Sequence, residues 1–457
     1  MIRSSITRCR PNLPACLILC CCTTAALAKE SPLSLPPAPR AVTSGQIDLF
    51  ERTPHSAQNN RINIFYATPR LPTDDGDNYS KDFDDTLRLG SAALTIGPDD
   101  LDWDSLHAIA TTAKRPEPKT KAEAHRWDLH LKRVAQAGQL APGDSLTDLS
   151  PGVQNYIDQI NSAIEQSAIK DLTIIVHGAF NSFDYAAAEA AQYRFYTGKQ
   201  AVVIAYAWPA VENHLAYSRN VEHAERSEAG LNRLLKILGQ HSDATRINII
   251  GYSVGGRLTS GTIARLADEY SDQDLVRAGD ALRLGHLYLA SSDGPIDEAR
   301  NYTPKFVQLF DVVTVTIAYD DPILGRAQLT GGGHRLGRPA KPSDKGGEDA
   351  PTEQQMQGIR TAMRNNDLHI LNLEISDIPG YQFSHGAWYL NPWVSSDVFV
   401  SLNLGLPPAE RGLASYMEDD LSYWYFPENY ASTLHQALLL HKARRERHEA
   451  EAEPQAQ

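Results

Sequence analysis

The sequence GYSVG at residues 251–255 contains the side chain best suited to nucleophilic chemistry, Ser253. The pattern G-x-S-x-G is typical of a serine on a sharp turn between a strand and a helix, because only glycine leaves room where the two backbones approach closely. Residues 246–250 (RINII) provide the buried, β-branched strand that such a turn requires. The turn would expose the Ser253 hydroxyl and direct the backbone N–H of Val254 toward a developing oxyanion.

A serine hydroxyl is a poor nucleophile near neutral pH. It therefore needs an imidazole to accept its proton and a carboxylate to orient that imidazole. His385, in the sequence FSHG beyond the last predicted strand, is the expected general base. With Ser253 it leaves one role, that of the acid, to be assigned.

The acid has two candidate turns. Asp321 ends the sequence YDD after a predicted strand, and Asp293 follows the strand before it. We predict Asp321, because a fold with this serine turn most often carries its acid after that later strand; Asp320 is a third choice. Asp293 stays the alternative acid, although an aspartate before Gly-Pro can equally serve as a helix N-cap.

A second loop, HGAFNS at residues 177–182, follows the buried run LTIIV at residues 172–176. We expect the backbone N–H groups of Ala179 and Val254 to form the oxyanion hole. His177 is expected to stabilise its own loop rather than to transfer protons.

Strands and helices alternate from residue 172 onward, which predicts a parallel sheet with its site beyond the carboxyl ends of the strands. The order serine, aspartate, histidine is that of alpha/beta hydrolases. The predicted fold class is therefore α/β, a three-layer alpha/beta-hydrolase fold with a mostly parallel central sheet and helices on both faces. The strands are expected at residues 172–176, 201–206, 246–250, 284–290, 312–319 and 368–375.

The predicted hydrolase domain covers residues 59–427. Its first part, residues 59–150, is expected to form N-terminal strands and a surface helix around residues 122–136. A flexible loop is predicted at residues 331–357, where glycine and lysine are frequent. Residues 428–457 are expected to form a C-terminal helix and a charged tail.

Residues 1–28 have the parts of a secretory signal peptide: three arginines, an apolar stretch too short to span a membrane, and Ala-Leu-Ala before Lys29. No later stretch is long and apolar enough for a span. The Pro-, Ser- and Ala-rich residues 29–58 are predicted to be a flexible leader. We therefore expect an exported protein, either periplasmic or secreted.

Composition excludes several classes of function. All five cysteines lie within residues 1–28, so the mature chain would have no disulfide, thiol nucleophile or Cys-ligated metal. The net charge of −13 becomes −16 without that segment, which argues against a nucleic-acid partner. The acids of residues 74–104 lack the spacing of a calcium loop and are read as solvated. No metal and no organic cofactor is expected.

The span from Ile62 to Val400 resembles the alpha/beta hydrolase family of unknown function called DUF900. The resemblance rests on FYATPR at 65–70, LG at 89–90, VHGAFNSF at 176–183, AWP at 207–209, Tyr217, the Ser253 turn, the Asp320–Asp321 pair and His385. It implies a hydrolase fold with the nucleophile at Ser253, the histidine at His385 and the acid at Asp321, and says little about substrate. Tyr252 and Val254 depart from the family's usual His and Met, so the pocket wall is expected to differ.

Together these features predict an exported serine hydrolase that cleaves an ester, small or lipid-like, through an acyl-enzyme on Ser253. A thioester or amide is the less favoured substrate. Two alternatives stay open: an acyltransferase that uses the same triad, and a non-catalytic binding or scaffold protein with a hydrolase fold. Neither the oligomeric state nor the acyl chain length follows from the sequence.

Overall fold

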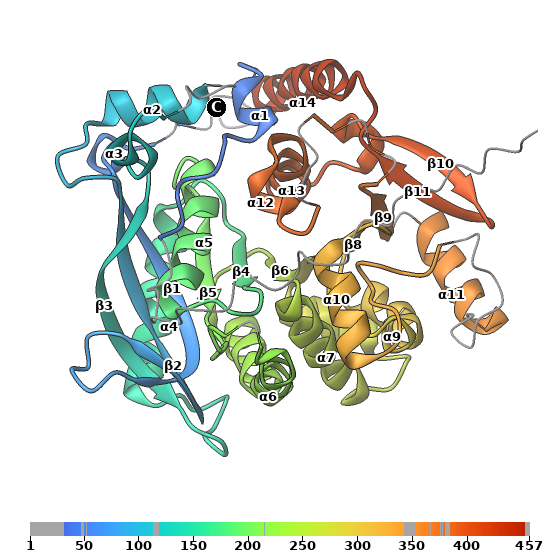
Figure 1. Ribbon diagram of the computed structural model, residues 1–457, viewed down its shortest axis with the longest axis horizontal. Coiled ribbons are helices and arrows are strands. Elements are labelled where there is room, and N and C mark those ends of the chain that lie inside the picture. Colours follow the sequence, from blue (N-terminus) through green and yellow to red (C-terminus); the bar gives the residue numbers. More distant parts are fainter. Residues whose placement is uncertain are drawn as a thin grey trace, which may run out of the picture. The chain divides into compact units, whose positions relative to one another are not determined.

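The structure is a computed structural model that describes residues 32–452 except 47–49, 52, 113–117, 214, 342–351, 366, 375, 377 and 380–383. The predicted signal peptide lies outside these residues. A single sheet organises the described chain, with the strand order β10-β11-β9-β8-β7-β6-β4-β5-β1-β2-β3 (Figure 1). The strands are β1 (Arg61–Pro72), β2 (Tyr79–Ile96), β3 (Leu129–Leu140), β4 (Leu172–Val176), β5 (Val202–Tyr206), β6 (Ile247–Tyr252), β7 (Leu284–Ala290), β8 (Val312–Ile317), β9 (Leu368–Asn372), β10 (Ala414–Glu418) and β11 (Leu421–Tyr425).

Helices cover both faces of this sheet (Figure 1). They are α1 (Arg40–Thr43), η1 (His55–Ala57), α2 (Trp103–Thr111), α3 (Lys121–Ala124), α4 (Pro151–Gln166), α5 (Phe183–Tyr196), α6 (Tyr217–His241), α7 (Val254–Asp268), α8 (Leu275–Leu282), α9 (Ile296–Leu309), α10 (Pro322–Gly331), α11 (Glu353–Arg364), α12 (Ala387–Leu390), α13 (Pro392–Leu404), η3 (Pro408–Arg411) and α14 (Tyr430–Ala452). None of the helices in the described part of the chain combines the length and apolar character needed to cross a membrane.

The pairing of the strands confirms the predicted fold class. From β11 through β9, β8, β7, β6, β4 and β5 to β1, every neighbouring pair is parallel, and antiparallel pairs occur only toward the two edges. β4, β5 and β6 are buried along their whole length, as continuous apolar strands between two helical layers should be. One core cluster packs the sheet against α4, α6, α7 and α9, and a second packs its other face against α5 and α13.

The surface helix expected around residues 122–136 is wrong. Only the short α3 is helical there, and residues 129–140 form the edge strand β3, paired antiparallel with β2. Its apolar residues pair with apolar residues of β2, for example Leu131 with Leu94 and Val134 with Ala92. Lysine and arginine on an edge strand protect it from pairing with other chains. Here they make the segment polar, which is why a surface helix was predicted.

The flexible leader expected at residues 29–58 is also wrong where the structure describes it. Leu33 and Leu35 are buried, and their backbone pairs with the chain at and just before the start of β3: Leu35 N–H donates to Trp127 O (2.8 Å), and Leu129 N–H donates to Leu33 O (2.8 Å). Val42 of α1 is buried as well. The prolines interrupt any regular spacing of apolar residues in this segment, so its sequence indicates no helix or strand. The leucines between the prolines are nevertheless buried.

The flexible loop expected at residues 331–357 is only partly open to comparison, because residues 342–351 lie outside the described chain. On either side of residues 342–351, hydrogen bonds hold the backbone in place. The segment 334–338 hydrogen-bonds to the turns that follow β7 and β8, with Gly337 N–H donating to Ser292 O (2.8 Å) and Ala318 N–H donating to Gly337 O (2.9 Å). Residues 353–357 belong to α11, whose first turn is held by a capping box at Thr352. These parts of the segment are ordered structure.

Candidate active site

Ser253 occupies the strained turn that its sequence predicts. It follows β6 directly and caps α7, with φ 55° and ψ −123°, a region that a residue with a side chain rarely adopts. A Cβ atom on Gly255 would lie 2.2 Å from the carbonyl oxygen of His177, and one on Gly251 would lie 2.7 Å from Thr259 Oγ1. Glycine is therefore required at both positions for the helix to pack this close to the sheet.

Three side chains from distant parts of the chain form a hydrogen-bonded row. His385 Nε2 lies 2.9 Å from Ser253 Oγ, and His385 Nδ1 lies 2.8 Å from Asp321 Oδ2. All three side chains are buried, Asp321 completely. If Nδ1 carries the proton toward the carboxylate, the lone pair of Nε2 faces the serine hydroxyl, which is the tautomer that a general base needs.

Asp321 is held on its other oxygen by the start of α10. Asp321 Oδ1 accepts hydrogen bonds from the backbone N–H groups of Ile323 (2.9 Å) and Leu324 (3.0 Å). The same carboxylate thus caps a helix and faces the imidazole. Asp320, its neighbour, is exposed.

Asp293, the alternative acid, is engaged by different partners. Asp293 Oδ2 accepts a hydrogen bond from the Tyr217 hydroxyl (2.6 Å), and Asp293 Oδ1 lies 3.2 Å from Arg335 Nε. Burial raises the pKa of this carboxyl. Of the two candidate acids, the geometry therefore favours Asp321 as the partner of His385.

The loop after β4 lies against Ser253. A Cβ atom on Gly178 would be 3.0 Å from the Tyr252 ring and 3.3 Å from Ser253 Cβ, so the space between the loop and the serine is too narrow for a side chain to fit easily. Ala179 is the next residue, in a turn completed by Phe180 with φ 67°. Among the described residues, neither the Ala179 nor the Val254 amide donates a turn or loop hydrogen bond to another backbone carbonyl. Val254 is the first residue of α7, a position where the backbone N–H has no partner within the helix.

His177 makes contacts that stabilise its own loop, the role that the sequence predicts for it. Its ring stacks on Trp208 with a centroid distance of 5.1 Å and an angle of 3°. Trp208 Nε1 donates to His177 O (2.7 Å), and the ring nitrogens of His177 lie 2.7 Å from Gly178 O and 3.1 Å from Trp208 O. Burial lowers the pKa of His177 to about 3, which keeps the ring neutral.

The structure adds two groups of residues to the site. Tyr252 packs against His385 at a ring distance of 5.3 Å and against Trp388 and Tyr389 at 6.0 Å each, which makes an aromatic wall beside the hydrogen-bonded row. Arg70 was visible only as part of the FYATPR element; it is 1% exposed and contacts the loop after β4.

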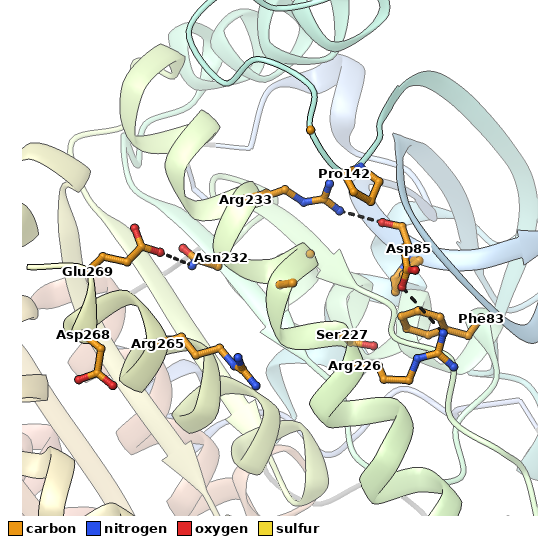
Figure 2. A pocket seen from close by; sticks show the side chains of 14 residues that line it. Phe83, Asp85, Pro142, Arg226, Ser227, Asn232, Arg233, Arg265, Asp268 and Glu269 are labelled. Atoms are coloured by element: carbon orange, nitrogen blue, oxygen red, sulfur yellow. Dashed lines mark hydrogen bonds and ion pairs between the residues drawn. The ribbon is translucent and has the colours of Figure 1, made fainter.

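A groove lies elsewhere on the molecule, and its lining does not include Ser253, Asp321 or His385. It has a volume of about 820 Å³ and runs along α6, between the start of β2 and the end of α7 (Figure 2). Its polar groups bond to one another: Arg233 Nη2 donates to Asp85 O and Asn232 Nδ2 to Glu269 Oε1, each at 2.8 Å. Among the residues that the structure describes, no group of three or more His, Cys, Asp or Glu side chains is arranged to hold a metal ion.

Comparison with known proteins relates part of the chain to one family. Residues 154–374 match the model of the family described as alpha/beta hydrolase of unknown function (DUF900). The matched part runs from α4 to β9 and contains Ser253 and Asp321, while His385 follows it. No match was found among curated proteins or among solved structures.

Proposed function

We propose that this protein, whose residues 154–374 belong to the alpha/beta hydrolase family of unknown function DUF900, is a serine hydrolase that cleaves carboxylic esters through an acyl-enzyme on Ser253. The observation that carries the proposal is the continuous hydrogen-bonded row from Asp321 through His385 to Ser253. A buried carboxylate, an imidazole and a strained serine in this order are the parts that activate a hydroxyl nucleophile.

In the first half-reaction, Ser253 Oγ attacks the carbonyl carbon of the ester while His385 Nε2 accepts the hydroxyl proton. Asp321 Oδ2 accepts the hydrogen bond from Nδ1 and stabilises the imidazolium that forms. The backbone N–H groups of Val254 and Ala179 donate to the oxyanion of the tetrahedral intermediate. The intermediate collapses as His385 returns its proton to the departing alcohol, which leaves the acyl group on Ser253.

In the second half-reaction, His385 accepts a proton from water, and the resulting hydroxide adds to the acyl carbonyl. The same two amides stabilise the second oxyanion. Collapse of this intermediate breaks the bond to Ser253 Oγ, which regains its proton from His385. The products are one carboxylic acid and one alcohol, and the enzyme returns to its starting state.

Acyl transfer would use the same residues with a second alcohol or amine in place of water. A scaffold protein without turnover would have no need for a buried row of three groups, so this reading is the weaker alternative. Residues 1–28 support the further proposal that the protein is exported. The amino-terminal residue of the protein recovered from the periplasm or the medium would test this, with Lys29 as the expected start.

The test of the proposed function is labelling of the purified protein with a fluorophosphonate, followed by turnover of p-nitrophenyl esters of increasing chain length. Wild-type protein should be labelled and active, and Ser253→Ala should lose both properties. Ser242→Ala, at a buried serine just after α6, is the matched control and should keep both. A folded wild-type protein that is neither labelled nor active would overturn the proposal. Adding an alcohol acceptor and measuring ester products would separate transfer from hydrolysis.

A further inference from the structure

Arg70 joins three segments around the candidate active site. It lies near the end of β1 and is 1% exposed. Its Nε donates to Ala207 O (3.2 Å) and Trp208 O (3.1 Å), and its Nη2 donates to Trp208 O (2.8 Å) and Asn181 O (2.7 Å). Nη1 donates to Ser80 O at 3.2 Å. All these acceptors are backbone carbonyls, so Arg70 fixes the path of the chain itself.

Two of these segments form or contact the loop that follows β4, next to Ser253. Asn181 is the next-to-last residue of the loop 177–182, and Trp208 stacks on His177 and donates to its carbonyl oxygen. The loop is thus fixed at its first residue by Trp208 and near its last by Arg70, and Arg70 also fixes Trp208. Ala179 lies between these two anchors, next to Gly178, which lies close to Ser253.

We propose that Arg70 is a positioning residue that holds the Ala179 amide in place for the oxyanion. The inference rests on the proposed function, because it assigns a role within that reaction. Oxyanion donors act only when they are 2.7–3.1 Å from the place where the charge develops. A loop held by two anchors keeps this distance without rearrangement during the reaction.

The geometry of the arginine side chain suits it to this role better than lysine. A guanidinium presents five N–H donors in a rigid plane and can grip carbonyls from different segments at once, whereas a lysine ammonium is a single point on a flexible stem. Thr68, two residues earlier on β1, adds a hydrogen bond from its hydroxyl to Ala207 O (2.5 Å). The element FYATPR therefore acts as a support for the loops after β4 and β5.

The test compares Arg70→Lys with wild type on two matched substrates, an ester and its thionoester. Sulfur is a weak hydrogen-bond acceptor, so the oxyanion donors stabilise the tetrahedral intermediate of the thionoester less than that of the oxygen ester. We expect Arg70→Lys to lower kcat on the oxygen ester about 10- to 100-fold, with KM little changed, while turnover of the thionoester falls much less. The kcat/KM for the oxygen ester divided by the kcat/KM for the thionoester should therefore fall.

Arg411→Lys is the matched control, because Arg411 is also a fully buried arginine but pairs with Asp397 on α13. It should lose stability and keep the wild-type ratio. An Arg70→Lys protein that folds and keeps the wild-type ratio would overturn the inference. If Arg70→Lys does not fold, Trp208→Phe, which loses the hydrogen bond to His177 O but keeps the stacked ring, must lower the ratio; otherwise the inference is also overturned. Absence of turnover in the wild type would instead overturn the proposed function.

Discussion

His385 Nε2 lies 2.9 Å from Ser253 Oγ, although the two residues are 132 positions apart in the chain. The contact depends on β6, which ends at the serine, and on the segment after β9, which carries the histidine. Since both side chains are almost fully buried, the hydrogen bond competes little with water. The arrangement leads to four predictions beyond the tests given above.

The first prediction separates the two candidate acids. Asp321→Asn should lower kcat about 10⁴-fold, because an amide at this position favours the wrong tautomer of His385. Asp293→Asn should lower kcat far less, since Asp293 bonds to Tyr217 and Arg335. Both variants are to be compared by kcat on one p-nitrophenyl ester. The assignment is wrong if Asp293→Asn is the more damaging change.

The second prediction concerns the close contact at the serine turn. Gly255→Ala places a Cβ atom 2.2 Å from His177 O and should lower the free energy of unfolding by more than about 2 kcal/mol, with loss of activity. Gly294→Ala is the control, because its nearest neighbour would be 3.4 Å away. Urea unfolding and ester turnover measure the two effects. Equal stability of both variants would contradict the packing described for the turn.

The third prediction is a pH dependence of stability. Folding lowers the pKa of His177 from its usual value near 6.5 to about 3, so between these values the unfolded chain binds more protons than the folded one. The contribution of His177 is complete above pH 6.5 and is lost as the pH falls toward 3. His177→Gln should therefore lose less stability than wild type from pH 6.5 to 4 in urea titrations. Parallel curves for the two proteins would refute this.

The fourth prediction compares a buried with an exposed ion pair. Arg335→Met leaves the Asp293 carboxylate buried without its cation and should cost about 3–5 kcal/mol of stability. Arg277→Met removes a pair whose arginine side chain is 81% exposed and should cost at most about 1 kcal/mol. Thermal unfolding of both variants tests this difference. A small effect of Arg335→Met would mean that the segment 334–338 is held by its backbone hydrogen bonds alone.

The sequence was most informative where one physical requirement dominates. Continuous β-branched runs such as residues 172–176 predicted the buried parallel strands, because a strand covered on both faces has no polar side. The glycines around Ser253 predicted the strained turn for a similar reason, since no other residue fits. The choice between Asp321 and Asp293 could not be made in the same way, because both follow strands and both are buried.

The errors occurred where burial is decided by distant segments. β3 looks polar by itself, and only its pairing with β2 shows which of its residues face the core. The leucines at positions 33 and 35 lie among prolines, and their burial depends on β3 and α5, which are remote in the chain. Arg70 is a similar case. Its partners are carbonyl oxygens, which every residue has, so no side-chain pattern announces them.

β1 lies inside the sheet, parallel to β5 on one side and antiparallel to β2 on the other. The region that matches the family begins only at residue 154, so β1 and Arg70 come from the chain before it, and His385 from the chain behind it. A fragment trimmed to residues 154–374 would keep the proposed nucleophile and acid, but it would lose the proposed base, expose the open side of β5 and release the loop after β4. Hydrolytic activity should consequently not be transferable as a module cut at the borders of sequence similarity.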